Sequence, residues 1–325
     1  MVALSLARLR RLACCLLPLL PGVLAAQGLP SYMPVNPMTA SRSGVYFQPY
    51  IDPDPGGTHV SLLLDYGSAI EYDIPAPRPS YLLDAELLRV SAVAVRDLDA
   101  RSFLLADLSV DGAYAGFLDG FLNWYHRVFG FELPERDARP ENQFAYRLSL
   151  PNGTTLVRKP SDLFLGDVRL GYGRRWSPAV QTLFAATLPT STGPDGYGRG
   201  TISVSALSSA RVRLSPRLTS ETGLGLGVTP RHGELGPYQR SWFLGASTGL
   251  RFRFWGRQSL FANLLYHSPY YHDTTLPALD ASELSLDFGW LLRTKSGREW
   301  KIGLTEDLKP KGPAIDVVFR LGMLR

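Results

Sequence analysis

Alternation of apolar and polar side chains is the strongest pattern in this chain. It is clearest in residues 242–254, where one row of alternate positions is mainly apolar and the other is mainly glycine, serine and arginine. A β-strand places alternate side chains on opposite faces, so this segment predicts a strand with one apolar and one polar face. The apolar row is Trp242, Leu244, Ala246, Thr248, Leu250, Phe252 and Phe254, and the other is Phe243, Gly245, Ser247, Gly249, Arg251 and Arg253.

The same alternation recurs along the chain and predicts an all-β protein of about 14 strands. Twelve is the alternative count, because the pattern of the first segment, GVYFQPYI, is weak. The predicted strands lie near residues 43–50, 58–71, 80–97, 102–115, 142–150, 162–175, 178–189, 200–213, 216–228, 239–254, 257–269, 282–293, 298–306 and 313–324.

Long and short connections alternate between these strands. The connections near 193–200, 229–239 and 268–281 are long, and those near 215–216 and 294–297 are short. One rim of long loops and one of tight turns is typical of bacterial outer-membrane barrels. We therefore expect a transmembrane antiparallel up-and-down β-barrel whose apolar rows face lipid and whose last strand runs toward the periplasm. The residues that we predict to line its lumen are Arg147, Arg169, Arg211, Arg213, Arg251, Arg253, Asp287 and Arg293.

Residues 116–130 break the alternation. Their apolar side chains fall on one arc at helical spacing, which predicts an amphipathic helix. Strand parity places this helix at the periplasmic rim. Three roles are open for it: a helix on the membrane surface, a partial plug of the barrel mouth, or a cover for apolar surface.

The first 26 residues have the layout of a cleaved export signal. Basic residues precede an apolar run, which is followed by small residues at Ala25 and Ala26. We expect cleavage after Ala25 or Ala26, a single barrel domain over 27–325, and location in the cell outer membrane. Both cysteines, Cys14 and Cys15, lie in this signal, so the domain would hold neither disulfides nor thiolate metal sites.

Charge and motifs exclude several classes of function. The formal charge of +5 falls to +2 without the three arginines of the signal, so it does not indicate a nucleic-acid partner. The glycines of 223–227 lead into no helix and form no dinucleotide motif, and the five histidines are scattered. We predict no cofactor and no metal. The expected partners are outer-membrane lipid, the barrel-assembly machinery and a small solute.

The run that starts at Asp111, DGAYAGFLDGFLNWYHRVFGFELPERDARPENQF, resembles the signature of the bacterial domain-of-unknown-function family 3187. Members have an acidic pair and an arginine in a strand, a Gly-Phe-Leu-Asp helix with a histidine, and then Arg-x-x-x-Pro-x-Asn. The matching residues are Asp84, Glu86, Arg89, Asp119, His126, Arg136, Pro140 and Asn142. The resemblance covers nearly all of 27–325 and implies an outer-membrane barrel with no assigned activity.

Three functions are compatible with these sequence features. The first is a narrow pore for small anionic or amphiphilic solutes, favoured by the inward arginines. The second is a closed structural or lipid-binding barrel. The third, a membrane lipid hydrolase, is disfavoured because His267 and Ser268 point to opposite faces of a strand, and because His126 and Asp119 have no nucleophile near them in sequence. We therefore predict no enzyme and no catalytic residue.

Overall fold

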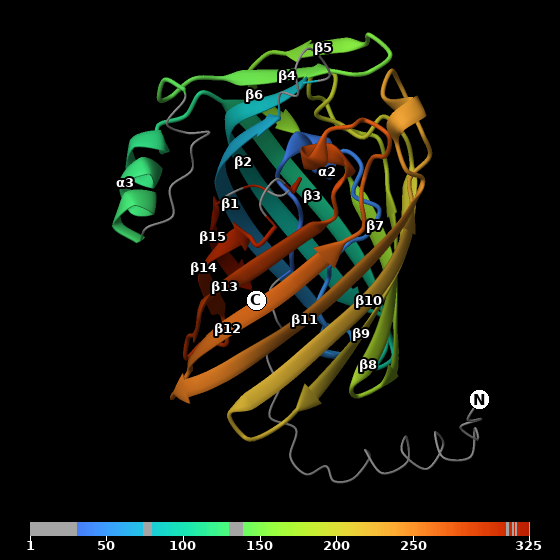
Figure 1. The fold of residues 1–325 in the computed structure, drawn as a ribbon. Helices are drawn as coiled ribbons and strands as arrows, with labels where there is room; N and C mark the ends of the chain where they lie inside the picture. The colour runs from blue at the N-terminus through green and yellow to red at the C-terminus, as the bar shows by residue number, and fades with distance from the viewer. Residues whose placement is uncertain are drawn as a thin grey trace, which may run out of the picture.

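The computed structural model describes residues 31–73, 80–129, 139–309, 312–313, 315 and 317–324. Its main feature is a closed ring of twelve antiparallel strands (Figure 1). The ring closes where β1 pairs with β15, with Asp65 opposite Arg320. The strands of the ring are β1 (Thr58–Asp73), β2 (Ser80–Asp97), β3 (Ser102–Tyr114), β7 (Arg169–Ser177), β8 (Val180–Thr187), β9 (Ser203–Arg213), β10 (Leu218–Val228), β11 (Trp242–Trp255), β12 (Gln258–His267), β13 (Glu283–Arg293), β14 (Glu299–Asp307) and β15 (Val317–Leu324).

The predicted antiparallel barrel is confirmed, with the alternative count of twelve strands. The predicted strand at 142–150 is β4 (Ala145–Ser149), which pairs with one end of β2 and with β5 (Thr155–Arg158) above the ring. The predicted strand at 162–175 is divided between β6 (Ser161–Leu165) and β7. The predicted strand at 43–50 is wrong, because this segment lies inside the barrel.

The two faces of the sheet are oriented as the alternation predicts. Leu244, Leu250 and Phe252 of β11 are exposed on the outside, whereas Arg251 is buried inside. Large exposed apolar side chains also occur on β1, β3, β9, β10, β12 and β14. A soluble surface rarely carries so extensive an apolar area, so this outer face is suited to lipid.

The two rims of the barrel differ in their connections. We call one the long-loop rim, with connections 115–168, 188–202, 229–241 and 268–282. The other is the tight-turn rim, with connections 98–101, 178–179, 214–217, 256–257 and 294–298. The last strand, β15, ends at the tight-turn rim. None of the helices in the described residues is long and apolar enough to cross a membrane.

Residues 31–52, which we call the lumen segment, run inside the ring. They form α2 (Pro37–Ala40) near the long-loop rim, then descend in extended form toward the tight-turn rim, where the chain enters β1 (Figure 1). Tyr32 forms an isolated bridge with Phe47, so the segment folds back on itself. Most of its side chains are buried. The lumen segment therefore occupies space that the wall side chains leave empty.

Inward-facing glycines of β10 and β11 form the surface on which the lumen segment lies. A Cβ atom added to Gly227 would lie 1.6 Å from the Gly44 carbonyl oxygen. A Cβ atom at Gly225 would lie 2.7 Å from Val45 Cγ1, and one at Gly245 would lie 2.8 Å from Phe47 Cζ. The glycines of the polar row are thus explained by the close approach of a second chain segment.

Gly227→Ala tests this packing. The new methyl group would collide with main-chain atoms of Gly44, so we expect displacement of the lumen segment and a loss of about 1–3 kcal/mol in the free energy of unfolding. Trypsin cleavage after Arg42 and urea unfolding in vesicles measure the two effects. Gly223→Ala is the control, because the three atoms nearest to its Cβ atom all belong to the wall, with the Ser247 hydroxyl at 2.6 Å. Equal protection of Arg42 in both variants would contradict the packing.

The predicted helix is present as α3 (Asp119–Phe129), but on the opposite rim from the one expected. It lies outside the barrel at the long-loop rim (Figure 1). The predicted rim assumed four strands before the helix. The ring has only three there, because 43–50 is not a barrel strand, and one strand fewer places the helix at the other rim. Its exposed face carries Phe121, Trp124 and Val128, as expected for a helix at a membrane surface.

A buried carboxylate on the outer face of β2 holds the start of α3. Glu86 accepts hydrogen bonds from the main-chain N–H groups of Phe117, at 2.6 Å, and Leu118, and from the Tyr66 hydroxyl. Gly116 is required beside it, because its φ is +78° and a Cβ atom there would lie 1.9 Å from Glu86 Cδ. An ionised group buried on an apolar face needs such donors.

Two more acidic residues extend this attachment. Asp84 accepts a hydrogen bond from Arg139 Nε at 2.5 Å. Asp119 accepts one from the Asn142 main-chain N–H at 2.6 Å and one from the Ser68 hydroxyl at 3.4 Å. The acidic residues of the family motif therefore fasten α3 and the chain after it to the outer wall.

Glu86→Ala should release α3. The substitution leaves two main-chain N–H groups and the Tyr66 hydroxyl without their acceptor, which costs about 2–4 kcal/mol. We expect faster trypsin cleavage after Arg127 in an otherwise folded barrel. Asp162→Ala, which removes an exposed carboxylate from β6, is the control. Unchanged protection of Arg127 in Glu86→Ala would show that the carboxylate does not hold the helix.

Candidate functional site

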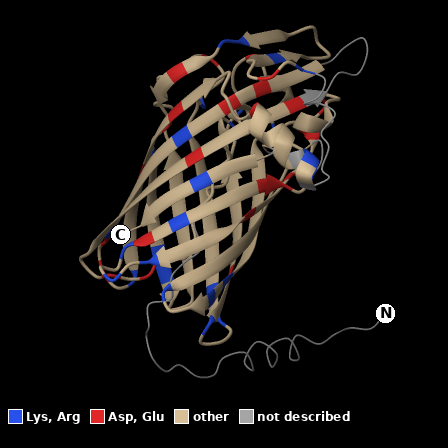
Figure 2. Cartoon of the chain, turned by 90° about the vertical axis from the view of Figure 1, so that its left-hand side faces the viewer, with Lys and Arg blue, Asp and Glu red and all other residues tan. Residues whose placement is uncertain are grey.

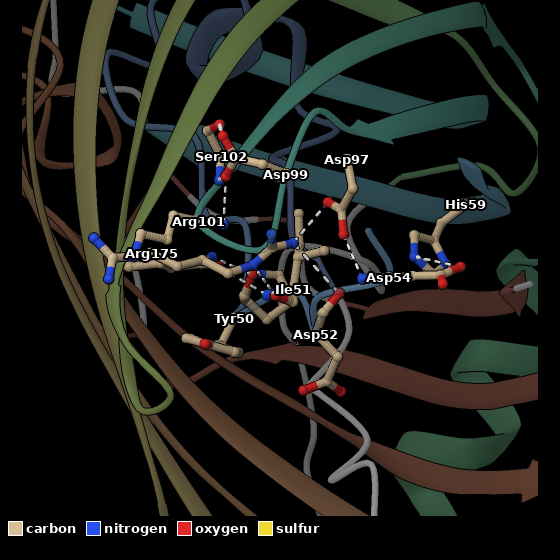
Figure 3. Close-up of polar contacts among 12 residues, drawn as sticks. Tyr50, Ile51, Asp52, Asp54, His59, Asp97, Asp99, Arg101, Ser102 and Arg175 are labelled. Carbon is tan, nitrogen blue, oxygen red and sulfur yellow. Dashed lines mark hydrogen bonds and ion pairs between the residues drawn. The ribbon is translucent and has the colours of Figure 1, made fainter. Parts of the chain in front are cut away.

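The candidate site is the lumen, where wall side chains bind the main chain of the lumen segment. Near the tight-turn rim, Tyr50 N–H donates to Glu221 Oε1 at 2.5 Å and Ile51 N–H donates to Gln181 Oε1 at 3.0 Å. Arg175 Nε donates to the Ile51 carbonyl at 3.0 Å (Figure 3). These bonds satisfy buried main-chain groups that a barrel strand would satisfy by pairing.

Ion pairs strengthen this lower attachment. Arg211 joins Asp52 of the lumen segment, at 2.7 Å, to Glu221 of the wall, at 3.1 Å. Arg175 pairs with Asp97 at 2.8 Å, and Asp97 also accepts the main-chain N–H of Asp54 (Figure 3). The part of the chain that leads from the lumen segment into β1 is thus fixed by charge-assisted hydrogen bonds, which are stronger than neutral ones.

Polar contacts also hold the part of the segment nearer the long-loop rim. Asn36 Nδ2 donates to Glu71 Oε1 at 2.6 Å, and Asn36 Oδ1 accepts the Met38 N–H at the start of α2. The Tyr32 hydroxyl donates to Glu283 Oε1 at 2.6 Å. Burial and the adjacent Glu283 carboxylate raise the pKa of Tyr32 well above its usual value, so its hydroxyl stays protonated and donates.

Charged groups of the wall are paired with one another deep in the lumen. Asp287 contacts Lys301 at 3.1 Å and Arg320 at 3.4 Å, and Arg320 contacts Asp65 at 2.8 Å. Two further pairs are Arg169–Asp107, at 2.7 Å, and Arg251–Glu299, at 2.8 Å. Buried charges are tolerated when they are paired in this way.

A cavity opens at each end of the lumen. The long-loop vestibule, of about 430 Å³, is lined by α2 and by residues of the 188–202 and 229–241 loops. The tight-turn vestibule, of about 390 Å³, is lined by the inner ends of β9 to β13 and the turns between them. The lumen segment lies between the two vestibules.

The tight-turn vestibule is strongly cationic. No acidic residue lines it, and many Lys and Arg residues gather at this rim (Figure 2). Among the described residues, Arg213, Arg217, Arg253, Arg257 and Arg293 make no ion pair with a carboxylate. The cationic residues that line this vestibule are Arg213, Arg217, Arg251, Arg253, Arg257, Arg293 and Lys295.

The predicted lumen-lining residues fall into three places. One group is buried inside the ring: Arg169, Arg211, Arg251 and Asp287. A second group, Arg213, Arg253 and Arg293, lines the tight-turn vestibule, as Arg251 also does. Arg147 does not line the lumen, because β4 lies outside the ring and the side chain is exposed.

The family-motif residues do not form one site. Asp84 and Glu86 lie on the outer face of β2 and Asp119 begins α3. Arg89 instead faces the lumen, 3.8 Å from Asp111. Pro140 and Asn142 are exposed near α3. Arg136 and the side chain of His126 lie outside the described residues.

Several wall and loop residues that bind the lumen segment were not predicted from the sequence. They include Glu71, Gln181 and Arg199. The glycines at 223, 225 and 227 were a signal for them, because a row of inward glycines leaves room for a second segment.

The candidate hydrolytic residues are not assembled into a catalytic site. The His267 Nδ1 atom lies 2.6 Å from the Ser268 carbonyl oxygen, and the Ser268 hydroxyl accepts the Leu244 N–H. His272 contacts Asp273, its neighbour in the 268–282 loop. No group of three or more His, Cys, Asp or Glu residues in the described part of the chain could hold a metal ion.

Several solved structures are similar to this chain, and one, with a TM-score above 0.5, supports the barrel architecture. The COG4313 outer membrane channel from Pseudomonas putida F1 superimposes with a TM-score of 0.53 at 12% identity, covering 84% of this chain and 97% of that protein. The Pseudomonas putida toluene transporter TodX gives 0.42 at 11% identity, covering 89% and 90%. The translocator domain of the autotransporter NalP from Neisseria meningitidis gives 0.44 at 11% identity, covering 84% and 89%.

Sequence comparison gives the family. No curated protein sequence matches this chain. A family model described as "Protein of unknown function (DUF3187)" matches residues 74–324, from the end of β1 to the end of β15. Because this match covers most of the chain, the protein belongs to the DUF3187 family.

Proposed function

We propose that this protein is an outer-membrane channel for small anionic or amphiphilic solutes, gated by the lumen segment. One observation carries the proposal: a segment that belongs to no strand of the ring separates two vestibules at opposite ends of the barrel. A ring of about eight strands is filled by its own side chains, whereas 16–18 strands leave an aqueous channel. With twelve strands, removal of the segment would leave a narrow passage.

The outer face and the rims support an outer-membrane location. Exposed apolar side chains surround the ring, as lipid contact requires. In barrels of this class the long loops face the exterior and the tight turns face the periplasm. The fold is also similar to that of an outer membrane channel. In this orientation α3 lies in the outer leaflet and the cationic vestibule opens to the periplasm.

The contacts of the lumen segment favour a gate over a permanent core element. Within the described residues, its only bridge is internal, between Tyr32 and Phe47. The wall holds it through side-chain hydrogen bonds, the Arg211–Asp52 ion pair and apolar packing, including contact with the inward glycines. The segment can therefore leave without breaking any strand pair of the ring. Residues 52–57, Asp-Pro-Asp-Pro-Gly-Gly, join it to β1, and Gly56 adopts a φ of +75° that favours glycine.

The charge of the tight-turn vestibule supports anionic solutes. Its lining includes seven basic residues and no acidic one. Such a cavity raises the local concentration of anions and repels cations. An amphiphilic solute would place its anionic group among these side chains.

A closed structural or lipid-binding barrel is the second candidate. It is favoured by the filled lumen and by α3, whose exposed Phe121, Trp124 and Val128 suit contact with acyl chains. Channel measurements distinguish the two candidates directly.

A disulfide between the lumen segment and the wall tests the gate. Val45 Cγ1 lies 2.7 Å from the position of a Cβ atom at Gly225, so Val45→Cys with Gly225→Cys brings two thiols within bonding reach. In planar bilayers we expect no current from the oxidised variant and recurrent openings after reduction. Deletion of 31–52 should give a steady current.

The two single-cysteine variants serve as controls for this test, and Cys14 and Cys15 are the only other cysteines. Folding of every variant is checked by its heat-dependent mobility in SDS gels. A folded deletion variant without current would overturn the channel in favour of the closed barrel.

Charge reversal in the tight-turn vestibule tests the solute class. In the deletion variant, Arg213→Glu, Arg253→Glu and Arg293→Glu together should lower the Cl⁻/K⁺ permeability ratio by about tenfold or more, because the field at the mouth changes sign. The zero-current potential in a KCl gradient measures this ratio. Arg101→Glu, on the same rim but not lining the vestibule, should leave it unchanged. An unaltered ratio in the triple variant would argue against anion selection there.

A further inference from the structure

Two buried guanidinium groups hold the end of the lumen segment near the long-loop rim. Arg42, in the segment, donates to the carbonyl oxygens of Pro230 at 2.7 Å, Thr229 at 2.9 Å and Arg240 at 2.8 Å. Arg199, in the 188–202 loop, reaches in the opposite direction. It donates to the carbonyl oxygens of Ser43 at 2.6 Å and Ala40 at 3.1 Å, and to the Ser203 hydroxyl at 2.9 Å.

These two arginines differ from the other arginines buried in the lumen. Arg169, Arg211 and Arg320 each form an ion pair with a carboxylate. In the described part of the chain, the side chains of Arg42 and Arg199 donate hydrogen bonds only to neutral oxygens, and the Nε atom of each lacks a hydrogen-bond partner. They are only 2% and 4% exposed, respectively. Two positive charges are therefore buried without an ion pair to a carboxylate, which is costly unless an anion joins them.

The electrostatic strain at these arginines is visible in their pKa values. Burial lowers the pKa of Arg42 to about 10. Burial, together with the nearby cations Arg169 and Arg42, lowers the pKa of Arg199 to about 9, although the nearby Asp167 carboxylate acts in the opposite direction. Both groups remain charged at neutral pH, so each would gain from an anionic partner.

Both arginines line the long-loop vestibule, which has room for such a partner. Arg158 and His232 also line this cavity of about 430 Å³, and its acidic residues are Asp167, Asp195 and Glu234. The Asp167 carboxylate accepts the main-chain N–H groups of Ser191 and Arg199, so it orders the loop and does not pair with either guanidinium group.

We infer that a small anion with a carboxylate or phosphate group binds to Arg42 and Arg199 in the long-loop vestibule and thereby loosens the lumen segment. Charge-assisted hydrogen bonds are stronger than those to neutral carbonyl oxygens. An anion would compete for the N–H groups that now hold Ala40 and Ser43. The site would make opening of the gate depend on an anion at the long-loop rim. This inference rests on the proposed gate, but the anion site itself can be tested independently.

The test uses inorganic phosphate as the probe, with NaCl at equal ionic strength as the reference. A Val45→Cys chain reports on the lumen segment, because Val45 is 1% exposed and reacts with a maleimide only when the segment moves. We expect phosphate to raise the labelling rate about five- to tenfold, a typical coupling between two sites. Calorimetry in detergent measures phosphate binding directly.

Arg199→Gln in the Val45→Cys chain separates the anion site from general loosening. This variant should label faster in NaCl, because two contacts to the segment are lost, and should neither bind phosphate nor respond to it. Arg175→Gln is the matched control, because it also removes two hydrogen bonds to the segment, at the Ile51 and Asp52 carbonyl oxygens, but lies at the far end of the lumen. It should label faster in NaCl and keep the phosphate response.

The outcomes distinguish this inference from the channel itself. Two results would overturn the anion site even if the deletion variant conducts. One is equal labelling of the Val45→Cys chain in phosphate and NaCl, and the other is a phosphate response that persists in Arg199→Gln. The opposite result is also possible: phosphate binds and loosens the lumen segment in a way that depends on Arg199, but the deletion variant carries no current. This result would support the anion site and refute the channel.

Discussion

Closure of the hydrogen-bonded ring is the constraint on which the rest of this structure depends. A closed sheet has no free edge, so alternate residues of each strand face the outside and the lumen in turn along its whole length. The outer rows can be apolar only if the charges of the inner rows are satisfied inside. Lys301, Asp287, Arg320 and Asp65 do this by forming one continuous chain of ion pairs between β14, β13, β15 and β1. Replacing one partner of such a chain leaves another charge buried and unpaired, which typically costs about 3–5 kcal/mol.

A ring of twelve strands creates a second requirement, because its lumen is wider than its own side chains fill. The lumen segment meets this requirement with a short helix and an extended chain, and the wall adapts to it with glycine in β10 and β11. Since the segment is not part of the ladder, its buried N–H and carbonyl groups depend on Glu221, Gln181 and Arg175. The barrel is therefore stable as a ring, while the content of its lumen is held by a limited set of side chains. This separation is what a gate requires.

The alternation was enough to predict the barrel because strand periodicity is a local property, and the long loops fixed the two rims. It could not separate barrel strands from other extended segments: the weak pattern of 43–50 was counted as a strand, but this segment is bound by side chains from distant parts of the chain. That miscount also reversed the rim predicted for α3. A stronger signal was present in β2, where Asp84 and Glu86 share the outward row with Leu82 and Leu88. Carboxylates on an apolar face need donors from a covering element, and α3 with the chain after it provides them.

The distribution of charge along the lumen connects the two vestibules. At the long-loop rim, Arg42 and Arg199 lie among acidic residues of the loops, whereas the tight-turn vestibule is lined by basic residues without acidic ones. An anion moving from the first to the second would therefore meet an increasingly positive lining, and its return would be opposed by the same field. Between them, Arg211 and Arg175 are neutralised by Asp52, Glu221 and Asp97 while the lumen segment is in place. Departure of the segment would remove Asp52 and leave Arg211 paired with Glu221 and Arg175 paired with Asp97. Opening the gate would therefore also remove one negative charge from the path of an anion.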